Sequence, residues 1–286
     1  MPPETARADV AAGDVVPSDL TVRRSRRRAL WVHAFALSLV AAGAHAEGLE
    51  PLLAALKSRE FARAEALVRN GADVNVAYAD GKTPLMVAGK RGLSGLVRAL
   101  LDAGADVNAT NRNGGTALMY AALAGDPHTL QLLIDAAADV NAAARNGWGA
   151  LTIAAVKGHE VAVAMLLANG ANPNHPDVYG WTPLMRAAER GRQAAAAALL
   201  ASARTDLARR DDDGATALHH AAEEGHTEMA AFLVERGADP QARDARGRTP
   251  AERAELSGHD YVASLLAKGV SPGDQPVPAG AGSARK

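Results

Sequence analysis

The chain has 286 residues, no cysteine and few aromatic residues. Without cysteine it can form neither a disulfide framework nor a thiolate site. Aromatic residues make up 3% of the chain, whereas a large globular core usually contains more rings. The 31 Lys and Arg residues nearly balance the 32 Asp and Glu residues, which gives no basic field for nucleic acid. An alanine-rich chain of this composition fits thin helical layers.

A leucine returns every 33 residues along most of the chain. It occupies positions Leu52, Leu85, Leu118, Leu151, Leu184 and Leu218. Two glycine series keep the same spacing, one from Gly48 to Gly247 and one from Gly92 to Gly258. One interval of 34 residues occurs in all three series, between about residues 191 and 214. This period predicts a stack of small supersecondary units, with function on a surface before a pocket.

The residues around the leucine identify the unit. Thr83-Pro84-Leu85-Met86-Val87-Ala88 recurs at residues 182–187 and, in its fullest form, at residues 216–221. Gly71-Ala72-Asp73-Val74-Asn75 recurs at residues 104–108 and, degraded, at 137–141. The pattern resembles the ankyrin repeat, which reads T-P-L-H-x-A, then G, then G-A-D-V-N. The resemblance covers about residues 48–269. It implies an all-α ankyrin solenoid of helix-turn-helix units joined by β-hairpin-like loops, with about seven repeats.

The repeat domain is expected over residues 47–269, with units near 48–80, 81–113, 114–146, 147–179, 180–213, 214–246 and 247–269. Threonine before proline suits a helix N-cap and first turn, and glycine between the two helices of a unit lets the chain reverse. Arg59 replaces that glycine in the first unit, and Ala251 replaces the leucine in the last. Such departures are typical of terminal units. Arg204 replaces a helix-ending glycine in the fifth unit and predicts a local irregularity there.

A different kind of sequence precedes the repeats. Six residues, Arg23-Arg24-Ser25-Arg26-Arg27-Arg28, are followed by an apolar run over 29–43 and by Ala44-His45-Ala46. This order predicts a cleavable secretory signal peptide within an N-terminal segment of residues 1–46, with cleavage between Ala46 and Glu47. A membrane anchor is the alternative. Residues 25–30 also partly resemble a twin-arginine export signal, so Sec and twin-arginine export both stay open.

These features predict a periplasmic or secreted protein that is not inserted in the membrane after cleavage. Residues 270–286 are rich in Pro, Gly and Ala and are expected to form a disordered tail.

Three constellations resemble catalytic or metal sites and have simpler structural interpretations. His219, His220, Glu223, Glu224 and His226 could imitate a metal cluster, yet His219 and His226 occupy positions that are often histidine in ankyrin repeats. Residues 211–214 resemble a calcium loop but lack its first ligand and its final glutamate. The methionine series at 86, 119 and 185 fits core filling better than copper binding. No nucleophile has a convincing base, so we expect no enzyme, no cofactor and no metal.

The resemblance places a partner on the hairpin tips and on the concave face of the first helices. The variable positions there are mostly aromatic or basic in the central units, with one aliphatic residue: they are Tyr120, Trp148, Ile153, Tyr179, Trp181 and Arg186, with Arg112 and Arg145 beside them. Trp, Tyr and Arg are the usual binding hot spots. A tryptophan in front of Thr-Pro-Leu can instead pack on the neighbouring hairpin. Binding and packing are therefore both open for Trp148 and Trp181.

The sequence supports three hypotheses about function. The first is a non-catalytic protein–protein interaction module in the periplasm or outside the cell, acting as a monomer on a protein partner. The second is an exported effector or inhibitor acting on a host or competitor protein. The third, a metal-binding or enzymatic protein, lacks a ligand set at workable spacing. Repeats of this kind do not record which partner they bind.

Overall fold

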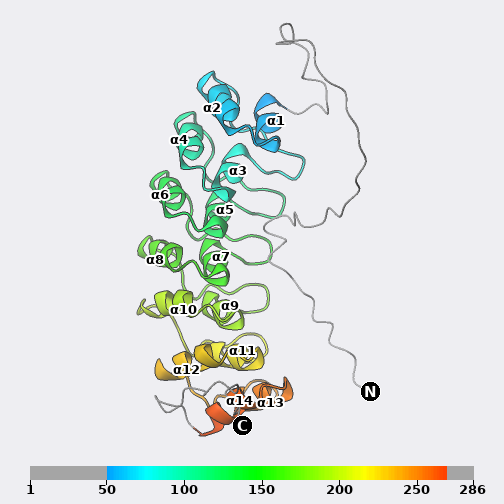
Figure 1. Cartoon of the computed structure of the whole chain (residues 1–286), viewed down its shortest axis with the longest axis vertical. Coiled ribbons are helices and arrows are strands. Elements are labelled where there is room, and N and C mark those ends of the chain that lie inside the picture. Colours follow the sequence, from blue (N-terminus) through cyan, green and yellow to red (C-terminus); the bar gives the residue numbers. More distant parts are fainter. Residues whose placement is uncertain (1–49, 269–286) are drawn as a thin grey trace, which may run out of the picture.

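The computed structural model describes residues 50–268, and these form fourteen helices without a strand. The helices pair in sequence order as seven helix-turn-helix units stacked in single file (Figure 1). The pairs are α1 Pro51–Lys57 and α2 Phe61–Arg69, α3 Pro84–Lys90 and α4 Ser94–Asp102, α5 Ala117–Ala124 and α6 Pro127–Asp135, α7 Ala150–Lys157 and α8 Glu160–Ala168, α9 Pro183–Glu189 and α10 Gln193–Leu200, α11 Ala217–Glu223 and α12 Thr227–Glu235, and α13 Pro250–Leu256 and α14 Asp260–Lys268. The all-helical repeat fold expected from the leucine series is thus confirmed.

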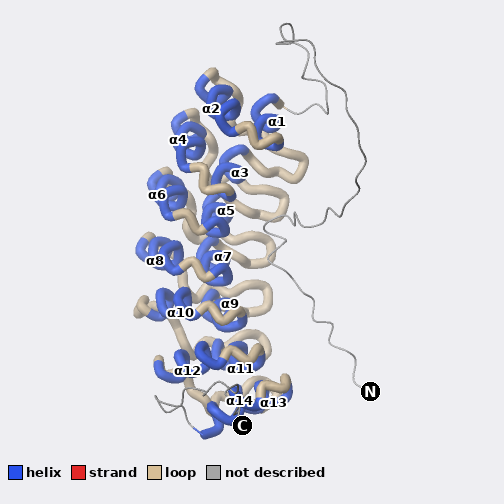
Figure 2. The backbone as a smooth tube through the Cα atoms, viewed as in Figure 1, coloured by secondary structure: helices blue, strands red, loops and turns tan. Residues whose placement is uncertain are grey.

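The loops between units all extend from the side of the odd-numbered helices (Figure 2). They turn back like β-hairpins, but within residues 50–268 the only pairing of strand type is one isolated bridge, between Ala143 and Gly149. The predicted N-terminal segment 1–46, its cleavage residues Ala44, Ala46 and Glu47, and the predicted tail 270–286 lie outside the described residues. No helix among residues 50–268 is long and apolar enough to cross a membrane.

A threonine directly precedes five of the seven odd-numbered helices, the exceptions being α1 and α7. The Thr83 hydroxyl accepts a hydrogen bond from the Met86 N–H at 3.4 Å, and the Thr182 hydroxyl accepts one from the Met185 N–H at 3.3 Å. Proline follows each of these threonines and occupies the first helical position, where no N–H is needed. In these two units the helix therefore begins at a fixed point just after the loop, which positions the loop relative to the helix.

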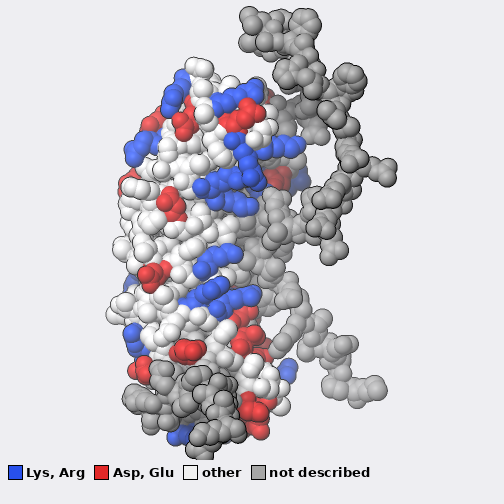
Figure 3. All heavy atoms as spheres, in the orientation of Figure 1, with Lys and Arg blue, Asp and Glu red and all other residues white. Residues whose placement is uncertain are grey.

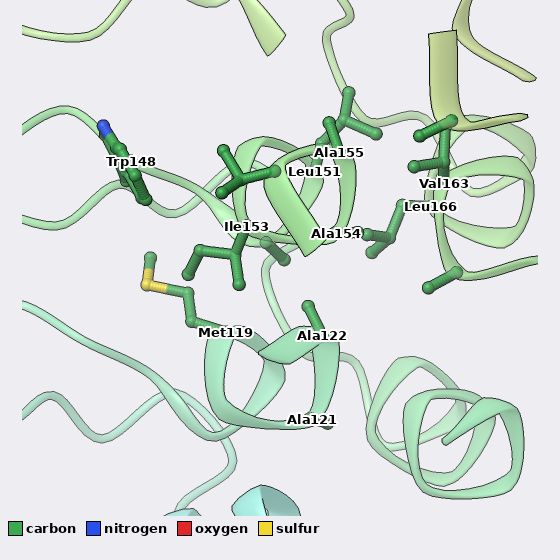
Figure 4. Close-up of a cluster of buried hydrophobic side chains, with 14 of the residues drawn as sticks. Met119, Ala121, Ala122, Trp148, Leu151, Ile153, Ala154, Ala155, Val163 and Leu166 are labelled. Atoms are coloured by element: carbon green, nitrogen blue, oxygen red, sulfur yellow. The ribbon is translucent and has the colours of Figure 1, made fainter. Parts of the chain in front are cut away.

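The hydrophobic core is continuous along the stack and lies between neighbouring units. The periodic leucines and the alanines at 88, 121, 154, 187, 221 and 254 are almost completely buried. Figure 4 shows Met119 and Ala122 of α5 facing Ile153 and Ala154 of α7 across one unit boundary. Small side chains let the helices approach closely, and at Gly89 an added Cβ would lie 3.1 Å from the Ala117 carbonyl oxygen. No unit can bury its apolar surface alone, so stability comes from stacking.

The extra residue of the fifth unit lies in the loop after α10. This helix has eight residues, whereas the other second helices each have nine. The Arg204 guanidinium donates to the carbonyl oxygens of Leu167 and Ala171 in the preceding unit, each at 3.1 Å. A cation at the carboxyl end of α8 suits the helix dipole there. The stack continues past this loop, since α9 packs on α11.

Candidate partner-binding surface

The tips of the hairpin-like loops form one connected row. We call this the tip row; it consists of residues 79–81, 112–114, 145–147, 178–180, 212–214 and 245–247. A backbone N–H of each tip donates to a carbonyl of the tip before it, from Arg112 to Asp80 at 3.0 Å, from Arg145 to Asn113 at 2.9 Å, from Val178 to Asn146 at 3.2 Å, from Asp212 to Tyr179 at 3.4 Å and from Ala245 to Asp213 at 2.8 Å. The row is therefore held in register along the whole stack.

One side chain at the start of each hairpin closes most of these loops. We call this the anchor position; its residues are Tyr78, Asn111, Ala144, Asp177, Asp211 and Asp244. The Asp177 Oδ1 atom accepts the N–H of Tyr179 at 2.9 Å and that of Trp181 at 3.1 Å. Asn111, Asp211 and Asp244 accept the equivalent pairs of N–H groups. These bonds add to the backbone hydrogen bond that closes each hairpin, from the N–H of the anchor residue to the carbonyl four residues later.

In four hairpins the other end of the anchor side chain contacts the residue nine positions later, on the following helix. The Tyr78 hydroxyl instead donates to the Leu53 carbonyl at 2.7 Å. Arg186 Nε donates to Asp177 Oδ2 at 2.8 Å, and Arg253 Nε donates to Asp244 Oδ2 at 2.7 Å. His220 lies 2.8 Å from Asp211 through Nε2 and Oδ2. In the third unit the pair is neutral, with Asn111 Nδ2 donating to the Tyr120 hydroxyl at 2.9 Å. In the fourth unit the pair is apolar, Ala144 with Ile153.

The two central tryptophans belong to this buried arrangement. The Trp148 indole N–H donates to Asp177 at 3.2 Å. The Arg186 guanidinium lies 5.4 Å from the centre of the Trp148 ring and 4.1 Å from that of Trp181. Trp181 in turn packs on the His220 ring with the centroids 3.8 Å apart. Cation–π contact and a paired carboxylate together compensate for burying the arginine.

Four of the predicted contact residues are therefore not available to a partner. Tyr120 is 1% exposed, Trp148 4%, Ile153 2% and Arg186 8%. Our expectation that they form one exposed face with Tyr179 and Trp181 needs correction, because their side chains turn toward the anchor residues and the neighbouring unit. For Trp148 the packing interpretation fits the contacts. Trp181 is half-buried in the stack with Arg186 and His220.

The exposed part of the predicted set lies at the tips. Tyr179 is 43% exposed and its neighbour Val178 55% exposed. Arg112 and Arg145, also predicted, are exposed on the two preceding tips. Asp212 and Asp213 are exposed on the following tip. The structure brings these residues together in one row rather than on a broad helix face.

The surroundings of two buried ionisable groups, His219 and Asp244, shift their pKa values. Burial lowers the pKa of His219 to about 4. Its Nδ1 accepts the Thr216 N–H at 3.1 Å while its Nε2–H donates to the Arg248 carbonyl at 3.1 Å, an arrangement that requires the neutral ring. Burial alone would raise the pKa of Asp244, but the Arg248 N–H and the Arg253 guanidinium lower it well below its usual value.

Asp211 follows the same rule. Burial alone would raise the pKa of this carboxyl, yet the hydrogen bond and the charge of His220 lower it below its usual value. On the face drawn in Figure 3, Lys and Arg side chains lie around α3 and α9 and Asp and Glu side chains lie around α11, with both signs side by side near α1 and α2. The charged anchor residues Asp177, Asp211 and Asp244 are buried beneath a surface that carries charges of both signs.

The histidines that imitate a metal cluster point to different groups. His219 contacts the Arg248 carbonyl, His220 contacts Asp211, and His226 Nε2 lies 2.9 Å from the Glu189 carbonyl oxygen. Across the described part of the chain, no three His, Cys, Asp or Glu side chains are grouped so that they could hold a metal ion.

A stack of helix pairs with a registered row of hairpin tips defines a helical-repeat solenoid, and the comparisons with known proteins give its family. The family model for ankyrin repeats in three copies matches residues 33–111, 52–144, 118–211 and 199–275. The chain belongs to the ankyrin repeat family. This fold is generally a non-catalytic scaffold that binds proteins.

Two solved structures illustrate the similarity. The ankyrin repeat domain of human ASB11 is 26% identical over 76% of this chain and 98% of that chain, with a TM-score of 0.67. The ankyrin repeat domain of Bcl-3, described as a unique member of the IkappaB protein family, is 28% identical over 78% of this chain and 100% of that chain, with a TM-score of 0.65. No curated protein sequence gives a significant match.

Proposed function

We propose that this protein is an exported, monomeric protein-binding module whose contact surface is the tip row. The observation that carries the proposal is the combination of order and exposure in that row. Val178 and Tyr179 are large apolar side chains left exposed on a backbone that hydrogen bonds hold in place. A surface that is already ordered loses little conformational entropy when a partner binds.

The buried side chains of Trp148 and Arg186 are not expected to contact a partner protein directly. Trp148 and Arg186 already have partners inside the protein, Asp177 for both of them. Their function in this proposal is to hold the hairpins that carry Val178 and Tyr179. Substituting them would damage the surface indirectly, through the fold.

Affinity capture with matched variants tests the binding role. The variant Arg145→Glu/Tyr179→Ser changes only exposed tip side chains, and Arg98→Glu changes an equally exposed arginine on α4, away from the tips. We expect the wild-type protein and the Arg98 variant to retain the same partner and the tip variant to lose it, with unchanged circular dichroism. Retention of the partner by all three proteins would contradict the proposed surface.

Export rests on the sequence of residues 23–46 and has its own test. The protein isolated from cells is expected to begin at Glu47, as read by N-terminal sequencing, whereas an intact Met1 would contradict cleavage. Fractionation then separates the two versions of the proposal. Recovery from the periplasm favours an interaction module that stays in the cell envelope, and recovery from the culture supernatant favours an effector or inhibitor that acts on a host or competitor protein.

A further inference from the structure

The tips of the central units change character in one direction along the stack. Arg112 and Arg145 occupy the same position on two successive tips, Val178 and Tyr179 follow on the next tip, and Asp212 and Asp213 follow on the one after. All six side chains are exposed. The four central tips therefore present a basic part, an apolar part and an acidic part in that order, between exposed Asp80 on the first tip and exposed Arg246 on the last.

The charges of the basic and acidic parts are not neutralised within the described residues. No ion pair among residues 50–268 involves Arg112, Arg145, Asp212 or Asp213. The first tip differs, since Lys82 pairs with Asp80 at 2.6 Å. Two arginines lie on adjacent tips, and two aspartates lie next to each other on one tip. Such groups can instead gain energy from a partner of opposite charge.

The spacing of the row limits what can contact all three parts. Neighbouring packed helices lie about 8–10 Å apart, so the three steps from Arg112 to Asp212 span about 30 Å. An extended polypeptide rises about 3.3 Å per residue, and about nine residues cover that length. The inter-tip hydrogen bonds keep the three parts at fixed separations.

We propose that the tip row binds an extended segment of a partner protein with acidic residues at one end, an apolar residue in the middle and basic residues at the other end. The acidic end faces Arg112 and Arg145, the apolar residue covers Val178 and Tyr179, and the basic end faces Asp212 and Asp213. Charge order fixes the direction of the segment and rejects segments of other order, while apolar burial adds affinity. This inference rests on the proposed function and specifies its partner.

A second copy of the chain is the competing occupant. Turned end for end, the row would place Arg145 of one copy near Asp212 of the other, because the apolar tip lies between them. The two occupants differ in one measurable respect. A peptide segment leaves the protein monomeric, whereas a second copy gives a salt-sensitive dimer that variants at Arg145 or Asp212 disrupt.

The test uses three fluorescent nine-residue peptides in titrations by anisotropy. The first has three Glu, a Leu-Tyr-Leu centre and three Lys; the second has the same composition with Glu and Lys alternating around that centre; the third has Lys at both ends. We expect the isolated protein to bind the first peptide at least about tenfold more tightly than the others, a difference of about 1.4 kcal/mol, and to lose that preference in high salt.

A variant then has to change the preference and not merely weaken binding. Arg112→Glu/Arg145→Glu gives the row an acidic part at both ends, and it is expected to prefer the peptide with Lys at both ends. The control Arg98→Glu is expected to behave as the wild-type protein does. Equal affinity for all peptides, no binding at millimolar concentration, or a dimer sensitive to these variants would each overturn the inference. A natural partner captured through Arg145 and Tyr179 in the absence of peptide selectivity would leave the proposed function standing and reject this inference alone.

Discussion

The first three hairpins and the last three solve the same packing problem with different chemistry. The anchor residue and the residue nine positions later are Tyr78 with Val87, Asn111 with Tyr120 and Ala144 with Ile153 in the first three, all uncharged. In the last three they are Asp177 with Arg186, Asp211 with His220 and Asp244 with Arg253, all ionisable. The same backbone hydrogen bond closes the hairpin in both halves, from the anchor N–H to the carbonyl four residues later, so the fold does not require a charged pair there.

The unit boundaries differ in the same sense. Asn75, Asn108, Asn141 and Asn174 each receive a backbone N–H from the next unit and donate to one of its carbonyls. Ala208 takes this place in the fifth unit and cannot form the bonds. The early boundaries thus rely on neutral amide bonds and the late hairpins on buried charge. Stability in the second half should therefore depend on pH and on complete charge pairs.

Removing one carboxylate should produce the largest effect. Asp177→Ala removes the closer of the two carboxylates that pair with Arg186 and leaves only Glu189, at 3.5 Å. We expect a loss of about 3–5 kcal/mol in the free energy of unfolding, measured by urea denaturation. The double variant Asp177→Ala/Arg186→Ile imports the apolar pair of the fourth unit and should recover much of the loss. A double variant no more stable than the single one would show that the charge pair is not what distinguishes the two halves.

The second largest expected effect is a loss of stability in the last three units at acid pH. The pKa of His219 is about 4 in the folded protein, against an ordinary value of 6.5, so folding favours the neutral ring. The stabilisation is complete above pH 6.5 and falls as the pH drops from 6.5 to 4, by about 3 kcal/mol. Protonation of Asp211 and Asp244, whose pKa values are lowered, removes more stability at still lower pH.

The control for this prediction exists in the chain itself, because the position of His219 is methionine at residues 86, 119 and 185. His219→Met should flatten the dependence of the urea midpoint on pH between 6.5 and 4. Trp148 and Trp181 lie in the central units and report the transition by fluorescence. An unchanged pH profile in the variant would assign the acid sensitivity elsewhere.

The asparagine hydrogen bonds between units predict a smaller loss of stability for one variant and a smaller gain for another. Asn141→Ala removes hydrogen bonds to the Asn172 N–H at 2.8 Å and the Gly170 carbonyl at 3.2 Å, and about 1–2 kcal/mol should be lost. Ala208→Asn should gain about 1 kcal/mol, because Gly237 and Asp239 stand at the sequence separations that Asn108 bridges to Ala137 and Asp139. Thermal unfolding of both variants checks the pair. A neutral Ala208→Asn would mean that the boundary after the fifth unit has a different geometry.

Ala137 gives the smallest expected effect. It occupies a helix-ending position with φ of 62°, where the equivalent Gly104 has φ of 85°. Ala137→Gly should stabilise the protein by about 1 kcal/mol by relieving the left-handed conformation, and Gly104→Ala should destabilise it by a similar amount. An added Cβ at Gly104 meets no atom within 4 Å, so backbone strain alone is measured. If Ala137→Gly and Gly104→Ala had the same free energy of unfolding, the proposed backbone strain at Ala137 would be contradicted.

The sequence predicted the fold well because the residues that build it repeat. The threonine caps, the leucines and the glycines of the turns recur at one spacing, and each has a local physical role. The variable positions were harder to interpret. Periodicity shows that Tyr120, Ile153 and Arg186 vary, but not whether a varying side chain points to solvent or to its own hairpin. A signal for the answer was present, since Asp precedes Arg186, His220 and Arg253 by nine residues while Ala precedes Ile153.

The exposed tips were predicted in part. Arg112, Arg145 and Tyr179 were chosen because of residue type and turn position, and they lie on the surface. Trp148 was chosen for the same reasons and is buried, because its indole N–H has a carboxylate acceptor one unit away. That contact joins residues 29 positions apart, and only the stacking of units brings them together.

The hydrogen bonds between tips give the row a constant spacing, one tip per unit. Length along this surface is therefore counted in whole units. Duplicating or deleting a unit would move every later tip by one fixed step without altering any earlier one. Contact length and contact chemistry can thus change separately, the first through the number of units and the second through two exposed residues on each tip.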